Sequence, residues 1–221
     1  MSVLIVATSH IASESIKEVE ETILKEKPEC VAVELDKLRY ENLKIEGETS
    51  NTEMLKHLGA STFLVVWIFK KLQQWLGSKV GILPGSEMMK AVEIAKKNNI
   101  RIALIDQDIG ATLNGIKNIP RGEKFKLVWY LIKAPVMIKF SSKSKDAVTI
   151  DLSKAPSDQL VDQAIEMLKQ EFPILYQILV DDRNKFMAEK IRELEKHFQK
   201  IVVVVGAGHK KGLGMSLEKS I

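Results

Sequence analysis

Short runs of apolar, mostly β-branched residues alternate with amphipathic segments along this chain. Each run is continuous rather than alternating, which is typical of strands that are buried on both faces of a parallel sheet. Residues 13–27, which lie between the first two runs, repeat apolar side chains at helical spacing on one face. The pattern predicts an α/β fold with a mainly parallel sheet flanked by helices. The four expected strands are residues 3–7, 30–35, 100–105 and 201–205.

One long stretch departs from this alternation, because residues 109–198 separate the third apolar run from the fourth. Prolines interrupt the stretch, and the segments between them have a helical pattern. We therefore expect a helical insertion that forms a cap over one edge of the sheet. A chain of 221 residues remains within the size of one domain, so residues 1–221 are interpreted as a single domain.

Composition and charge exclude several classes of protein. With 45 % hydrophobic and 28 % charged residues, the chain is neither disordered nor fibrous. The net charge of +4 is spread over helical segments rich in Glu and Lys, so no nucleic acid is expected as a partner. No apolar stretch reaches the roughly 20 residues that span a bilayer. The single cysteine, Cys30, lies inside an apolar run, which indicates a buried thiol and a reducing, cytoplasmic location.

Two segments, residues 61–67 and 127–138, are apolar on almost every side. A helix in a monomeric cap needs only one apolar face, so part of this surface is expected to be buried between subunits. The chain is therefore predicted to form a homo-oligomer, which light scattering tests.

Polar side chains follow all four predicted strands. In open α/β sheets, ligands bind beyond the carboxyl ends of the strands, so these side chains are expected to meet at one edge. Two imidazoles and several carboxylates are suitable ligands for a divalent cation that keeps one position open for water. The sequence therefore predicts a cation site formed by groups from His10, Glu34, Asp36, Asp106 and His209.

Each of these residues also has a structural alternative. A histidine such as His10 can cap a helix, and the carboxylates that follow the second strand can pair with Arg39. Asp106 can cap the helix that begins near residue 109, although Asp108 is the stronger candidate for that cap.

The glycines around His209 favour a ligand site over a structural turn. Gly206, Gly208 and Gly212 remove side chains around the imidazole. Glycine permits positive φ and the close approach of backbone to a ligand, whereas a structural turn needs about one such residue.

Six blocks, taken in order, resemble the TraB/PrgY family, which is grouped with the Tiki and GumN proteins. The family is marked by two Gly-x-x-His motifs and by a glutamate that ends the second strand. The resemblance covers nearly the whole chain. The blocks are His10 with Ser13-x-Ser-Ile, residues 31–36 with Arg39, residues 85–88, residues 103–106, residues 183–188 and residues 204–209.

The resemblance implies a metal-dependent peptidase or a protein that inactivates a peptide. His10, Glu34 and His209 fall on the family's motif positions and would hold Mn²⁺, Co²⁺ or Zn²⁺, which lowers the pKa of a bound water. Asp36 or Asp106 would act as general base, so that a peptide or small-molecule substrate is hydrolysed.

Arg183 has two interpretations. It can clamp a substrate carboxylate or the developing oxyanion, or it can form an ion pair with Asp106 or Glu34.

One feature weighs against a simple transfer of this activity. The first motif carries Ala7 where the family has glycine, and a non-catalytic peptide-binding or signalling regulator is the alternative function. Many relatives continue into C-terminal hydrophobic spans, so the resemblance also implies membrane association for a longer form.

Overall fold

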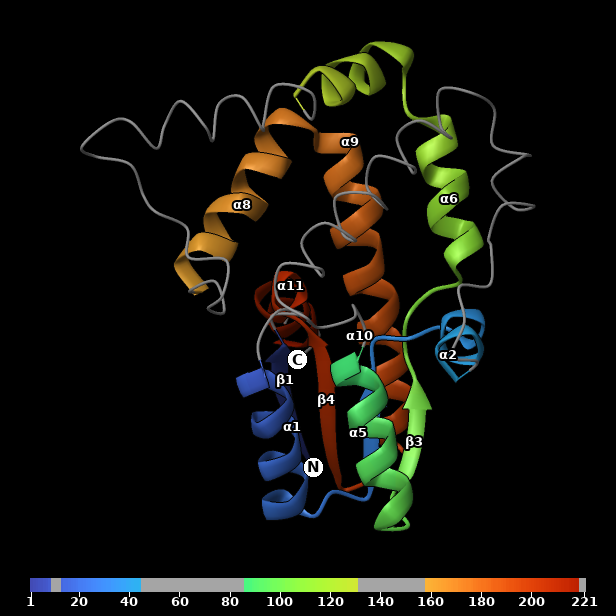
Figure 1. Cartoon of the computed structure of the whole chain (residues 1–221), viewed down its shortest axis with the longest axis vertical. Coiled ribbons are helices and arrows are strands. Elements are labelled where there is room, and N and C mark those ends of the chain that lie inside the picture. The colour runs from blue at the N-terminus through green and yellow to red at the C-terminus, as the bar shows by residue number, and fades with distance from the viewer. Residues whose placement is uncertain (9–12, 45–85, 131–157, 219–221) are drawn as a thin grey trace.

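The computed structural model describes residues 1–8, 13–44, 86–130 and 158–218, and these residues contain one parallel four-stranded sheet (Figure 1). The strand order is β1-β4-β2-β3, so the last strand of the chain lies between the first two. The predicted α/β class is therefore confirmed. The strands are β1 (Ser2–Thr8), β2 (Cys30–Val33), β3 (Arg101–Leu104) and β4 (Lys200–Gly206).

The central position of β4 sets the geometry of the carboxyl edge. β4 pairs in parallel with β1, where Thr8 lies opposite Gly206, and with β2, where Val33 lies opposite Val204. The backbone N–H of Glu34 continues the ladder by donating to the Val204 carbonyl at 3.0 Å. The chain that leaves β2 and the chain that leaves β4 therefore emerge side by side.

Helices cover both faces of the sheet, as the continuous apolar runs predict (Figure 1). α1 (Ser13–Glu26) and α5 (Ser86–Lys97) pack on one face, against Val202 and Val204 of β4. α10 (Asp182–Glu195) and α11 (Ala207–Glu218) pack on the other face, against the alternate residues of the same strand. Because successive side chains of a strand point to opposite faces, one run of valines supplies both cores.

The helices between β3 and α10 lie beyond the carboxyl ends of the strands (Figure 1). They share a small core of their own that includes Ile116, Leu127 and Leu175. Asp108 caps the first of them by accepting a hydrogen bond from the Gly110 N–H at 2.7 Å, as expected for the stronger cap candidate. The elements are α6 (Ile109–Asn118), a helix over residues 121–130, α8 (Asp158–Glu171), α9 (Pro173–Tyr176) and a π-helical turn, η1 (Gln177–Asp181).

The segments expected at a subunit interface are only partly described. Leu127 is buried within the chain, whereas Trp129 and Tyr130 are exposed. Residues 61–67 and 131–138 lie outside the described residues, so the homo-oligomer stays a prediction. None of the helices that the structure describes is long and apolar enough to cross a membrane.

Cys30 lies in β2 and is buried, as its apolar run predicts. Burial raises the pKa of its thiol from 9.0 to about 11. Between these values the unfolded chain loses the thiol proton and the folded chain keeps it, so the free energy of unfolding falls as pH rises. We expect this loss to reach about 2–3 kcal/mol. Urea unfolding at pH 8 and pH 10.5 checks it against Cys30→Ala, because other groups titrate equally in both proteins. A variant with the same pH dependence as the native chain would contradict the assignment.

Candidate functional site

A cluster of polar residues, here called the polar cluster, lies at the carboxyl edge of the sheet. Its members come from the ends of β2 and β3, from the first turn of α2 (Lys37–Lys44) and from α10 and α11. Most of its members are buried. Charged groups are rarely buried without partners, so these side chains are expected to contact one another. The members are Glu34, Asp36, Arg39, Asp106, Arg183, Asn184 and His209.

Arg183 links two carboxylates of the polar cluster. Its Nε and Nη2 donate to the two oxygens of Asp106 at 3.0 and 2.7 Å, and Nη2 also donates to Glu34 Oε1 at 2.5 Å. Nη1 donates to the Leu179 carbonyl at 3.2 Å, so four of the five N–H donors are used. Burial by itself would lower the pKa of Arg183, but the charges of Glu34 and Asp106 and their hydrogen bonds raise it above its ordinary value. Arg183 therefore makes both ion pairs of its structural interpretation.

The π-helical turn η1 precedes α10 directly and bears on the position of Arg183. A π turn inserts an extra residue, which rotates the following helix relative to the preceding one. Leu179, whose carbonyl accepts from Arg183, lies in this turn. Such turns occur frequently at functional sites.

Glu34 lies at the centre of the polar cluster. Its Oε1 faces Arg183, and its Oε2 accepts a hydrogen bond from the Gly206 N–H at 2.6 Å. Gly206 is followed directly by α11, whose positive amino-terminal end favours a carboxylate. Glu34 Oε1 also lies 3.4 Å from His209 Nε2. The expected proximity of Glu34 and His209 is therefore found.

His209 is held from its other nitrogen. Nδ1 lies 2.8 Å from Asn184 Oδ1, and both residues are buried. Asn184 approaches α11 so closely that a Cβ at Gly212 would lie 2.3 Å from its Nδ2. Gly208 and Gly212 lie within α11 and do not have the positive φ that their spacing suggested. At position 212, the missing side chain makes room for an asparagine rather than for ligand backbone.

The two candidates for a general base differ in their hydrogen bonds. Asp106 accepts from Arg183 and from the Gln107 N–H, and Arg39 Nη1 donates to its Oδ2 at 2.9 Å. Asp36 Oδ1 accepts from the backbone N–H groups of Leu38 and Arg39 and so caps α2. Asp36 Oδ2 is buried and has no hydrogen-bond partner among the described residues. Of these two candidates, only Asp36 therefore has a carboxylate oxygen that accepts no hydrogen bond from the described residues.

Arg39 forms an ion pair, but with a different carboxylate from those named in the structural alternative. The sequence places Arg39 near Glu34 and Asp36, but the guanidinium reaches across to Asp106 at the end of β3. The reason is that Asp36 is turned back to cap the helix that carries Arg39, so only the backbone of Arg39 contacts it.

The described part of the polar cluster fits a divalent cation in part. Glu34 and His209 present one oxygen and one nitrogen at a separation that a single ion can bridge, and Asn184 orients the imidazole from behind. Three carboxylates and two guanidinium groups leave one net negative charge, which a cation offsets. Among the described residues no three His, Cys, Asp or Glu side chains are grouped to hold a metal ion. His10, the third expected ligand, lies outside the described residues.

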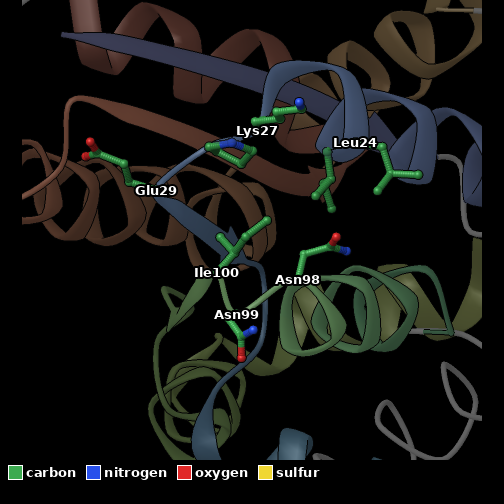
Figure 2. Close-up of a pocket in the computed structure, with 8 residues that line it drawn as sticks. Leu24, Lys27, Glu29, Asn98, Asn99 and Ile100 are labelled. Carbon is green, nitrogen blue, oxygen red and sulfur yellow. The ribbon is translucent and has the colours of Figure 1, made fainter.

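A hollow lies elsewhere, at the amino-terminal edge of the sheet (Figure 2). It measures about 410 Å³ and lies between the loops that lead into β2 and β3. Its polar groups serve the fold, because Glu29 accepts from the Gln199 N–H and Asn98 donates to the Ile94 carbonyl. The chemistry-bearing side chains are therefore not in this hollow.

Three contacts of the polar cluster were not predicted from the sequence. They are the Asn184 amide on His209, the Gly206 N–H on Glu34 and the Leu179 carbonyl on Arg183. Asn184 follows Arg183 in a block already noted, which was the one available signal. The two backbone contacts leave no mark on side-chain identity.

Fold and site together define an α/β protein that buries a Glu–His–Arg cluster at the carboxyl edge of a parallel sheet. A family model described as the TraB/PrgY/gumN family matches residues 2–218. The chain belongs to this family.

Proteins similar in sequence to this chain occur in an archaeon and in mammals. A Methanocaldococcus jannaschii protein described as uncharacterised is 37 % identical over 221 residues, which cover 98 % of this chain and 53 % of that protein. TraB domain-containing proteins of Bos taurus and Homo sapiens are 24 % identical over 241 residues, which cover 96 % of this chain and 61 % of each protein. The chain thus spans about half to three fifths of the length of the curated relatives it matches.

Proposed function

We propose that this chain is a metal-dependent hydrolase that acts on a peptide or a related small molecule. The observation that carries the proposal is the buried contact of 3.4 Å between Glu34 Oε1 and His209 Nε2. A carboxylate and an imidazole that face each other at this distance, at the edge where α/β proteins bind ligands, are suited to hold one cation between them.

In this proposal Glu34, His209 and His10 would hold Mn²⁺, Co²⁺ or Zn²⁺. Such an ion supplies a water of lowered pKa and polarises the bond to be hydrolysed. Asp36 would be the proton acceptor at this edge, because its Oδ2 has no hydrogen-bond partner among the described residues whereas the oxygens of Asp106 accept from two arginines.

Arg183 keeps Glu34 in place in the proposed reaction. Its bidentate bond to Asp106 fixes the guanidinium plane, and Nη2 then holds Oε1 of Glu34 on the side of His209. A clamp on the substrate remains a further role for Arg183, with the one N–H donor that these hydrogen bonds do not use.

A specific observation also favours a second candidate, a non-catalytic peptide-binding or signalling regulator. The Glu34–Arg183 contact of 2.5 Å is shorter than the Glu34–His209 contact of 3.4 Å. If Glu34 serves only as the ion-pair partner of Arg183, the polar cluster holds the helices on the sheet and needs no metal.

Metal titration separates the two candidates. We expect the chain, purified without chelator, to bind about one Mn²⁺, Co²⁺ or Zn²⁺ per molecule in calorimetry and to cleave members of a fluorogenic peptide library only with the ion present. His209→Ala should lose both properties. His197→Ala is the matched control, because His197 is exposed at the end of α10. A chain that binds no ion stoichiometrically would favour the regulator.

A further inference from the structure

We propose that Asn184 is a positioning residue that keeps a proton on Nδ1 of His209, and that position 212 is glycine in order to admit Asn184. The inference deepens the proposed function and rests on it in one respect, namely that His209 acts through Nε2. It assigns a task to two residues that the hydrolase proposal itself does not use.

The contact between the two side chains determines which nitrogen carries the proton. Asn184 Oδ1 lies 2.8 Å from His209 Nδ1. An amide oxygen only accepts hydrogen bonds, so this contact requires a proton on Nδ1. If the amide were turned round, its NH₂ group would face Nδ1, and Nδ1 would have to be bare. The position of the proton on His209 therefore reports the orientation of Asn184.

The surroundings of Asn184 leave it little freedom. It is 2 % exposed, and a Cβ at Gly212 would lie 2.3 Å from its Nδ2, far inside van der Waals contact. Gly212 lies inside α11, where glycine is less favourable than alanine. A glycine at this cost is explained by the asparagine that passes over it.

A proton on Nδ1 leaves the lone pair of the His209 ring on Nε2. When a neutral imidazole carries its proton on Nδ1, its Nε2 presents a lone pair to Glu34 Oε1 at 3.4 Å. Two electron-rich atoms face each other in this arrangement, so a positive ion between them is favourable. Imidazoles that ligate metals commonly donate their second N–H to an oxygen in this way.

Two-bond ¹H–¹⁵N NMR of protein labelled at its four histidines tests the inference directly. In the chelator-treated native chain we expect the His209 signals to show a proton on Nδ1. Asn184→Leu removes the acceptor at similar volume and should shift the proton toward Nε2. Asn184→Asp keeps an acceptor and should retain the Nδ1 proton. Folding of each variant is checked by circular dichroism.

Gly212→Ala provides a second, independent variant if Asn184→Leu does not fold. Its methyl group should displace the Asn184 amide and move the proton in the same direction as Asn184→Leu. The matched control is Gly214→Ala in the same helix, since a Cβ at position 214 meets nothing within 4 Å. It should leave the His209 signals unchanged.

The outcomes separate this inference from the proposed function. A native chain with the His209 proton on Nε2 alone, or an Nδ1 proton that persists in both Asn184→Leu and Gly212→Ala, would overturn it. If the proton behaves as expected, Zn²⁺ should bind Asn184→Leu about 10–100-fold more weakly than the native chain. If the proton behaves as expected but Zn²⁺ binds no form of the protein, the positioning role stands and the hydrolase proposal fails.

Discussion

Replacing Arg183 by methionine is expected to lower the free energy of unfolding by about 3–5 kcal/mol, the usual cost of leaving buried charges without a partner. The change removes the bidentate bond to Asp106 and the bond to Glu34, while both carboxylates stay buried. Asp106 keeps the half-exposed Arg39, and Glu34 keeps the Gly206 N–H, so the loss falls short of complete desolvation. Urea unfolding at pH 7 measures the difference.

The pH dependence of this effect follows from the raised pKa of Arg183. A raised folded pKa gives a contribution that is fully present below the ordinary pKa of arginine and is lost only above it. The arginine therefore stays charged from pH 6 to pH 9, and the stability difference should be constant there.

Lys185→Met is the matched control for this prediction. Lys185 lies on the same helix and pairs with Asp181 at 2.7 Å, but its side chain is 61 % exposed. An exposed pair contributes little, so this variant should unfold within about 0.5 kcal/mol of the native chain. If Arg183→Met were as mild as Lys185→Met, the ion pairs would not hold the carboxyl edge together.

The sheet was predictable because its strands carry a local signal. Residues 201–205 form an uninterrupted apolar run, and such a run is typical of a strand with a core on each face. The strand order was not predictable in the same way, since β4 inserts between β1 and β2 through contacts that are distant in sequence. The proximity of Glu34 and His209 could still be predicted from the sequence, because all parallel strands bring their carboxyl ends to one edge.

The side-chain contacts within the polar cluster were harder to predict from the sequence. Arg39 follows Asp36 by three residues, which suggested a pair, but the Asp36 carboxylate caps α2 and the Arg39 guanidinium reaches Asp106 instead. The residue types of the π turn before α10 do not distinguish it from an α-helix. The direction in which the Arg183 side chain points therefore could not be predicted from the neighbouring sequence. Tertiary contacts decide both cases, and local sequence patterns do not record them.

Glu34→Gln is expected to weaken metal binding by at least 10–100-fold, as loss of a ligand or of its support does. The amide keeps the shape of the side chain but removes the negative charge that offsets the cation. The same change should also lower the free energy of unfolding, by about 1–3 kcal/mol, because a buried hydrogen bond is lost. Glutamine has one acceptor oxygen, whereas Glu34 accepts from Arg183 on Oε1 and from the Gly206 N–H on Oε2. In either orientation of the glutamine amide, its NH₂ group would face one of these two donors and could not accept from it.

The two readouts of Glu34→Gln assign the role of Glu34. Arg183 keeps its bidentate bond to Asp106 in this variant, so the stability loss should be smaller than in Arg183→Met. Glu93→Gln is the control, since Glu93 pairs with lysines on an exposed face of α5 and should change neither readout. A variant that melts early and still binds the ion with native affinity would show that Glu34 only anchors Arg183. Loss of binding beyond what its fraction unfolded explains would identify Glu34 as a ligand, because an anchor has no reason to set the affinity of a fully folded chain.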